Sequence, residues 1–155
     1  MRGGWMVVTR RRLDSLAVLT LMALAVMLGS CRISPLASMR LEGTEWVLVT
    51  VAGKPPLTGA PVSAAFSAEQ ISGSTGCNRY LGEYAASRGD ITIGDLARTE
   101  RYCTDPVGVM DQEEAVLDAL ISAAGYRVSG TRLELLDADD NVVLAFGPAA
   151  AVPES

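Results

Sequence analysis

Residues 126–146 read YRVSGTRLELLDADDNVVLAF, and this stretch gives the clearest indication of the fold. It contains three short runs rich in β-branched, aromatic and aliphatic side chains, which is typical of strands. The runs are Tyr126–Ser129, Arg132–Leu136 and Val142–Phe146. The turn-forming residues Gly130-Thr131 and Asp137–Asn141 separate them. We therefore expect three antiparallel strands joined by tight turns at the C-terminal end of the domain.

The same pattern of short strands and turns occurs earlier in the chain. The earlier predicted strands are Thr44–Val51, Val62–Phe66, Gln70–Ser74, Arg79–Ala85 and Ile91–Ile93. Strands at this spacing indicate an antiparallel, barrel-like sheet. One segment breaks the pattern, because apolar residues recur at helical spacing from Met110 to Ala124. Asp105 can cap this helix, Pro106 suits its first position and Gly125 ends it.

These elements predict an α+β fold that is dominated by β structure. We expect an antiparallel, barrel-like sheet of short strands with one amphipathic helix over about residues 106–124. The length of 155 residues leaves room for one such domain.

Composition and charge exclude several classes of function. The chain has no histidine, which removes Ser/His and Cys/His nucleophile pairs and histidine-ligated zinc. Residues 1–30 hold four arginines and one aspartate, so residues 31–155 carry nine basic and seventeen acidic side chains, a formal charge of −8. Such an acidic surface repels phosphate backbones, and we expect no nucleic-acid partner.

The N-terminus has the pattern of an export signal. Three arginines, Arg10, Arg11 and Arg12, precede the thirteen uncharged residues Leu16–Leu28. As a helix this run spans about 20 Å, which is short of the roughly 30 Å hydrocarbon core. It therefore indicates a secretory signal. The alternative of a buried core helix fits the adjacent arginines poorly. Residues 9–13, TRRRL, also resemble a twin-arginine signal, and the choice of export route stays open.

The residues that follow, Leu28-Gly29-Ser30-Cys31, resemble the lipobox of bacterial lipoproteins. In that family the cysteine is acylated and becomes the first residue of the mature protein. The resemblance implies a signal peptide over residues 1–30, lipidation of Cys31 and a lipidated tether over residues 31–40. Arg32 follows the cysteine, and by resemblance to lipoprotein sorting it favours the outer membrane, facing the periplasm. Several acyl chains, palmitate among them, anchor such a chain stably.

Cys77 and Cys103 remain as an even pair in an oxidising compartment, where disulfides persist. A structural disulfide would close a loop of about 26 residues and stabilise the fold by about 3.5 kcal/mol. Two unpaired buried thiols and a redox-active pair are the alternatives. The spacing is not that of a C-x-x-C motif, and no basic partner for a reactive thiol is evident.

Together these segments resemble the META domain family, the HslJ-like proteins of bacterial envelopes. The likeness covers residues 41–147 and is strongest at G-C-N-R-Y (76–80), T-x-x-x-C (99–103) and M-x-x-E (110–113). The motif residues, which the resemblance implies are structural, are Trp46, Gly76, Asn78, Arg79, Tyr80, Gly82, Thr99, Met110 and Glu113. The resemblance implies a compact β-rich domain, a link to heat shock and stress tolerance, and no catalytic residues or cofactors. Residues 148–155 then form a disordered tail.

Two motif residues also have a chemical interpretation. Asn78 could bind a ligand, but an asparagine in such a motif more often adopts a left-handed backbone or bonds to its own turn. Glu113 lies on the apolar side of the predicted helix, where a carboxyl could be an acid of raised pKa. No second carboxylate stands at a catalytic spacing, so we expect burial beside an arginine such as Arg79 or hydrogen bonds to backbone N–H groups.

Two other segments resemble ligand loops only in part. Residues 137–141, DADDN, match the start of a calcium loop, but Val142 replaces the required glycine and Pro148 the final glutamate. They predict a hairpin turn instead. Residues 73–76 are glycine-rich but lack the lysine of a phosphate loop, so we expect no metal or phosphate site.

Three hypotheses for function follow. The first is a non-enzymatic, monomeric envelope module that is anchored by Cys31 and contacts another envelope protein during stress. The second is a carrier that holds an apolar ligand or acyl chain in the barrel, which predicts an open cavity under the helix. The third is a thiol-redox protein that uses Cys77 and Cys103.

Overall fold

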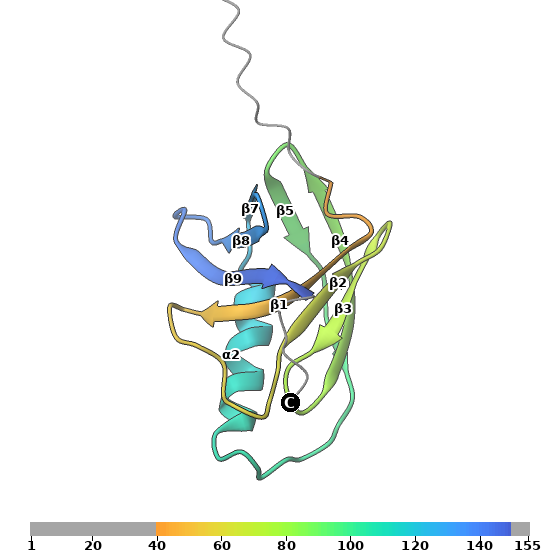
Figure 1. Cartoon of the computed structure of the whole chain (residues 1–155). Coiled ribbons are helices and arrows are strands. Elements are labelled where there is room, and N and C mark those ends of the chain that lie inside the picture. Colours follow the sequence, from red (N-terminus) through yellow and green to blue (C-terminus); the bar gives the residue numbers. More distant parts are fainter. Residues whose placement is uncertain (1–39, 150–155) are drawn as a thin grey trace, which may run out of the picture. The chain divides into compact units, whose positions relative to one another are not determined.

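The computed structural model describes residues 40–149 (Figure 1). The predicted signal peptide, the lipidation site Cys31, almost all of the tether and most of the tail lie outside the described residues. Within them the chain forms nine strands and one helix. These are β1 (Thr44–Val51), β2 (Ser63–Phe66), β3 (Gln70–Ser74), β4 (Arg79–Ser87), β5 (Asp90–Ile93), β6 (Ala97–Arg98), α2 (Val109–Ile121), β7 (Gly125–Ser129), β8 (Arg132–Leu136) and β9 (Val142–Pro148).

Eight of the strands close into an antiparallel barrel. Their order is β3-β2-β1-β9-β8-β7-β5-β4, and the pairing of β3 with β4 completes the ring. The two-residue strand β6 lies beside Tyr80 and Leu81 of β4. The β-dominated, antiparallel fold with one helix is therefore confirmed, and the barrel is closed. Closure leaves few unpaired strand edges, which are the usual sites of unwanted association.

The pairing between β5 and β7 is the shortest strand pairing of the barrel. Only Asp90 and Gly125 pair there as strand residues. Two further backbone hydrogen bonds reinforce this pairing: Ile91 N–H donates to Ala124 O at 3.0 Å, and Tyr126 N–H donates to Gly89 O at 2.7 Å.

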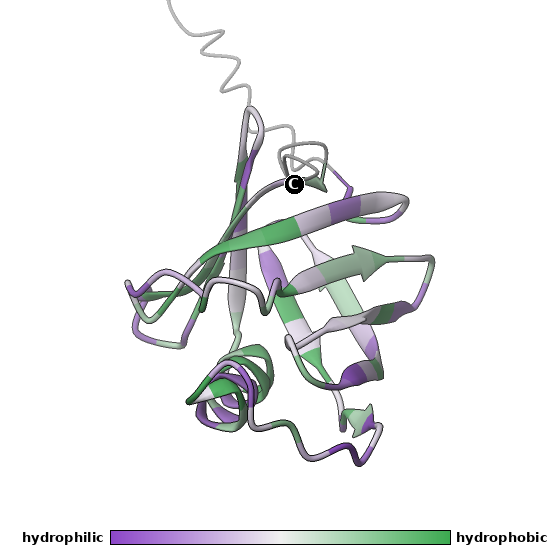
Figure 2. Cartoon of the chain, turned by 60° about the horizontal axis from the view of Figure 1, so that its bottom comes forward, coloured by the Kyte–Doolittle hydropathy of each residue, from purple (hydrophilic) through white to green (hydrophobic). Residues whose placement is uncertain are grey.

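Helix α2 packs its apolar face against the barrel, beside β9, β1 and β5. Val116, Leu117 and Leu120 are buried on this face. Figure 2 shows the helix nearly end-on, with hydrophobic residues toward the strands. The helix is thirteen residues long. Within residues 40–149 no helix is long and apolar enough to span a membrane.

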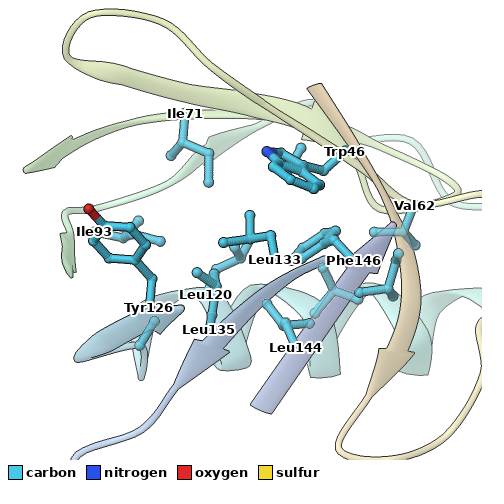
Figure 3. Packing of buried hydrophobic residues seen from close by; sticks show 14 of the residues in the cluster. Trp46, Val62, Ile71, Ile93, Leu120, Tyr126, Leu133, Leu135, Leu144 and Phe146 are labelled. Atoms are coloured by element: carbon cyan, nitrogen blue, oxygen red, sulfur yellow. The ribbon is translucent and has the colours of Figure 1, made fainter. Parts of the chain in front are cut away.

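The barrel interior is filled by large side chains from the strands and the helix. Figure 3 shows them converging between the strands and α2. Fully or almost fully buried members are Trp46, Phe66, Ile71, Leu120, Leu133, Leu135, Leu144 and Phe146. At about 1.5–3 kcal/mol for each buried large side chain, this cluster supplies most of the driving force for folding.

The helix lies within the predicted range of about residues 106–124 and is three residues shorter at each end. The helix begins after Gly108, which has φ +88° and makes no side-chain cap, and not after Asp105. Pro106 lies in a preceding turn, in which its C=O accepts the Val109 N–H at 3.1 Å. Gly108 adopts its positive φ without strain, because glycine has no Cβ. The chain can therefore pass from the turn directly into the helix at Val109.

The helix ends at Ile121, four residues before the predicted stop. Gly125 is instead the first residue of β7. The helical spacing of apolar residues continues through Ala124. This residue nevertheless bonds to the sheet and not to the helix, since its N–H donates to Leu136 O of β8 at 2.8 Å. At the C-terminus β9 extends to Pro148, which pairs with Trp46, so the predicted tail begins later than residue 148.

Candidate functional site

Three of the motif residues, Asn78, Thr99 and Glu113, meet in a buried polar cluster at the N-terminal end of α2. The Glu113 side chain is fully buried. Its Oε2 accepts hydrogen bonds from Thr75 Oγ1 at 2.6 Å and from the Asn78 N–H at 3.2 Å. Its Oε1 accepts from Asn78 Nδ2 at 3.0 Å and from Arg98 Nη1 at 3.1 Å. Four donors therefore surround this carboxylate, as a buried charge requires.

Asn78 connects this carboxylate to the segment after β6. Its Oδ1 accepts from Thr99 Oγ1 at 2.7 Å and from the Arg101 N–H at 2.8 Å. Its Nδ2 donates to Arg101 O at 2.9 Å as well as to Glu113. Every hydrogen-bonding position of the amide is thus occupied. The Asn78 side chain thus bonds segments distant in sequence and not its own turn as predicted, and its φ is not positive. No polar atom of the side chain remains for a ligand.

The arginine beside Glu113 is Arg98 rather than Arg79. The Arg79 side chain is exposed, because along β4 Tyr80 and Gly82 are buried on the inward face while Arg79 and its alternate neighbours lie on the outward face. Arg98 lies opposite Tyr80 on β6 and reaches the carboxylate with its side chain half exposed. Glu113 is therefore buried beside an arginine and accepts a backbone N–H, as expected. The example Arg79 was wrong because the short strand β6, which carries Arg98, was not predicted.

Gln112 belongs to the cluster as well and was missed from the sequence. Its Nε2 donates to Ala60 O at 3.1 Å and to Thr75 O at 3.0 Å. Its Oε1 accepts the Leu57 N–H at 2.6 Å. Gln112 thus ties the loop between β1 and β2 to the loop after β3. A polar residue next to Glu113 on a buried helix face was the available signal.

Gly76 is required by the same cluster. It has φ +104°, a region that L side chains rarely adopt. A Cβ on this residue would lie 2.8 Å from Gln112 Nε2 and 2.9 Å from Ala60 Cβ. Both the positive φ and the lack of room for a Cβ therefore favour glycine at this position.

A disulfide joins Cys77 to Cys103 beside the cluster, with their Cα atoms 5.9 Å apart. Of the three states that the sequence left open, the structure excludes two unpaired thiols. The bridge ties the turn between β3 and β4 to the loop before α2. Since Asn78 follows Cys77, the bridge also holds the Thr99–Cys103 segment against the amide that binds it. The loop-entropy estimate of about 3.5 kcal/mol applies to this 26-residue separation.

Two aromatic motif residues support the barrel from within. Trp46 is buried in β1, and its Nε1 donates to Thr44 Oγ1 at 2.7 Å. Tyr80 is buried in β4, and its hydroxyl donates to Ser63 O at 3.0 Å. Burial raises the pKa of the Tyr80 hydroxyl well above its ordinary value of 10. Both polar atoms are therefore paired, which is the usual condition for burying such rings.

The remaining motif residues have packing roles. A Cβ on Gly82 would lie 2.5 Å from Leu96 Cδ2, so glycine lets the segment before β6 approach β4. Met110 packs on a small apolar cluster of Ala60, Cys77 and Val109 at the start of α2.

The Asp137–Asn141 segment forms the predicted hairpin turn. Asp137 Oδ1 accepts the N–H groups of Asp139 and Asn141, each at 2.9 Å. Hydrogen bonds from the Asn141 side chain, and then from backbone N–H groups, lower the pKa of the Asp137 carboxyl. No group of three or more potential metal ligands occurs among the described residues.

Outside the polar cluster, the structure has shallow surface grooves. One of about 670 Å³ borders the distal half of β4, and one of about 430 Å³ lies beside Arg98 on the outer face of α2. The space under α2, where an apolar carrier would need a cavity, holds Leu120, Leu133 and Phe146, each at most 1% exposed. The described residues therefore contain a buried polar cluster whose hydrogen-bonding positions are occupied, and open grooves on the surface.

Comparison with known proteins identifies the relatives of this fold. Two NMR structures are similar to the chain at 28% identity. One covers 72% of this chain and 94% of its own, with a TM-score of 0.57. The other, a protein from Burkholderia xenovorans, covers 70% and 83%, with a TM-score of 0.56. A DUF4847 family protein from Bacteroides vulgatus, at 13% identity, covers 69% and 93% with a TM-score of 0.53 and shares the fold alone.

No curated protein matches the chain. The META domain family model matches residues 39–150, slightly more than the predicted 41–147. The match includes every residue of the polar cluster and both bridged cysteines. The chain therefore belongs to the META domain family.

Proposed function

We propose that this protein is a non-enzymatic, lipid-anchored module of the bacterial cell envelope that contacts another envelope protein during stress. It is exported, acylated on Cys31 and held at the outer membrane facing the periplasm, where it acts as a monomer. The META family match and the lipobox-like residues before Cys31 support this proposal.

The observation that carries the non-enzymatic part is the full engagement of the motif side chains. Glu113, the buried carboxylate, accepts from four protein donors. A general acid or base needs a free position within hydrogen-bond reach of a substrate. Cys77 and Cys103 are bonded to each other. These side chains thus stabilise a scaffold, and the surface is left for contact with a partner.

The disulfide supports the envelope location. Disulfides persist in oxidising compartments such as the periplasm and are rare in the cytosol. The bridge, the export signal predicted over residues 1–30 and the lipobox-like residues each point to the same compartment from different parts of the chain.

Membrane flotation of the full chain, expressed in a bacterium with lipoprotein processing, tests the anchor. We expect the parent chain to float with outer-membrane vesicles and to incorporate labelled palmitate. A Cys31→Ser variant should do neither, whereas a Cys77→Ser and Cys103→Ser double variant should still do both. Palmitate incorporation by the Cys31→Ser variant would refute the anchoring site.

The redox alternative has a separate test. If Cys77 and Cys103 exchange with substrate disulfides, the parent protein should accelerate the reduction of a model disulfide protein such as insulin, and the double serine variant should not. We expect the two proteins to give the same rate. A parent rate above that of the variant would replace the structural interpretation of the bridge.

A further inference from the structure

The distal half of β4 has an unpaired backbone edge. Tyr84 N–H donates to Glu69 O at 3.0 Å, on the side of the β2–β3 hairpin. Alternate residues of a strand direct their N–H and C=O groups to the same edge, so Ala86 directs its groups to this side too. The pairing of β3 with β4 ends at Gln70 and Glu83. Ala86 therefore lies beyond the end of β3.

The opposite side of β4 confirms this assignment. Ala86 lies opposite Ile91 of β5, but the Ile91 N–H donates to Ala124 O, on the β7 side. Ala86 thus faces β5 in a non-hydrogen-bonded pair, and its own N–H and C=O point away from β5. Among residues 40–149, neither these two groups nor the Tyr84 C=O has a hydrogen-bond partner. We call these three groups the β4 edge.

The β4 edge borders the largest of the surface grooves described above. The groove, of about 670 Å³, is lined by Tyr84 and Ala86 on the inward face of β4 and by Ala85 and Ser87 on the outward face. It therefore follows the edge on both sides. Figure 1 shows the β4–β5 hairpin (green, at the top) extending past the turn between β2 and β3. The small alanine side chains leave the backbone of this hairpin accessible.

The charges around the groove are mostly acidic. Glu42, Glu69 and Glu83 line it and form no ion pair within the part of the chain that the structure describes. The negative charge of Glu42 also contributes, after burial, to a raised pKa of the Tyr84 hydroxyl. Arg40 and Arg88 are the basic residues of the lining. A ligand that presents several positive charges would meet three unpaired carboxylates here.

We propose that the β4 edge binds an extended, lysine- or arginine-containing peptide segment of a partner protein, which adds to the barrel as a short antiparallel strand. In such strand addition, main-chain hydrogen bonds give affinity and alternate side chains occupy the groove on either side. The partner's backbone pairs with Ala86 and the Tyr84 C=O, and its basic side chains pair with the groove carboxylates. This proposal rests on the proposed interaction function and names the partner's chemistry.

A synthetic peptide tests the edge directly. The probe is an acetylated octapeptide that repeats Lys-Val four times, and its matched control repeats Glu-Val. Each is titrated into the isotope-labelled full chain in mild detergent and followed by amide NMR and hydrogen exchange. We expect the lysine peptide to slow exchange of the Ala86 amide about tenfold, because this N–H becomes hydrogen-bonded. The Ala85 amide, which faces β5, should change little, and the glutamate peptide should not bind.

Two variants separate the backbone and charge contributions. Ala86→Pro removes the N–H that the edge uses without removing a barrel hydrogen bond, and it should weaken peptide binding about tenfold. A Glu69→Gln and Glu83→Gln double variant should weaken it about fivefold while folding as the parent does. If the proline variant does not fold, the double variant decides the question.

Several results would overturn the proposal. These are no binding of the lysine peptide, equal binding of both peptides, or binding that neither variant weakens. A dimer in light scattering without peptide, with the Ala86 amide already slow to exchange, would assign the edge to a second copy of the chain instead. If the lysine peptide does not bind but the chain is acylated, the strand-addition proposal is refuted and the proposed envelope function is retained. If the peptide binds but the chain is never acylated, the β4 edge is supported and the lipid-anchored function is refuted.

Discussion

Replacing the buried carboxylate of Glu113 should destabilise the fold strongly, and the structure indicates how much. In Glu113→Ala, one Nδ2 hydrogen of Asn78 loses its acceptor inside the protein, whereas the Asn78 N–H loses Glu113 but keeps Thr75 Oγ1 at 3.2 Å. Thr75 can still donate to Asn78 O, and the half-exposed Arg98 can turn to water. The one orphaned donor costs about 1–3 kcal/mol, and the small cavity adds about 1 kcal/mol. The expected loss is therefore about 2–4 kcal/mol.

Glu113→Gln keeps the shape but replaces one acceptor oxygen by a donor. With its NH₂ group toward the Oε1 position, the new side chain faces Asn78 Nδ2, donor against donor. With the opposite orientation it faces the Asn78 N–H and Thr75. Either orientation removes at least one buried, charge-assisted hydrogen bond, so we expect a loss of about 2–3 kcal/mol.

Urea unfolding at neutral pH, followed by circular dichroism with the disulfide intact, measures both losses. For a slope near 1.5 kcal/mol per molar, a loss of 3 kcal/mol lowers the midpoint by about 2 M. Glu114→Gln is the matched control, because Glu114 is the next residue of the same helix and is exposed. It should change stability by less than about 0.5 kcal/mol. If Glu113→Gln unfolds within that margin of the parent, the cluster does not have the structural role assigned to it.

Other features give further predictions. Reduction of the Cys77–Cys103 bridge should lower the free energy of unfolding by about 3.5 kcal/mol, which urea unfolding with and without reductant measures. Gly76→Ala should cost more than Gly130→Ala, since both have positive φ but only Gly76 lacks room for a Cβ; thermal unfolding of the pair checks this. Because the pKa of Tyr80 is raised in the folded state, its contribution to stability is full below pH 10 and is lost as the pH rises above that value. An ultraviolet pH titration should therefore show its ionisation only as the protein unfolds at high pH.

The sequence predicted the strands best where alternation and turn chemistry agree. The bounds of β1, β3 and β8 match the predictions, because each lies between turn residues that cannot continue a ladder. Strand β6 was not predicted, since two residues carry no periodicity. The start of α2 was misplaced because Asp105-Pro106 has the composition of a cap, whereas Gly108 can begin a helix directly after a turn.

The candidate site was predicted only in part for a related reason. The motif named Asn78 and Glu113, but the partners of these residues depend on pairing between distant strands. Arg98 reaches Glu113 because β6 pairs with β4 at Tyr80. The β4 edge likewise depends on where β3 stops pairing with β4. Register of this kind cannot be obtained from local sequence patterns.

The intact mass of the protein isolated from native membranes, recorded with and without reduction, tests whether the chain is a processed, acylated lipoprotein with a bridged domain. We predict a mass equal to residues 31–155 plus acyl groups, and a gain of about 2 Da on reduction as the Cys77–Cys103 bridge opens. A chain that retains residues 1–30, carries no acyl group and does not change mass on reduction would contradict it.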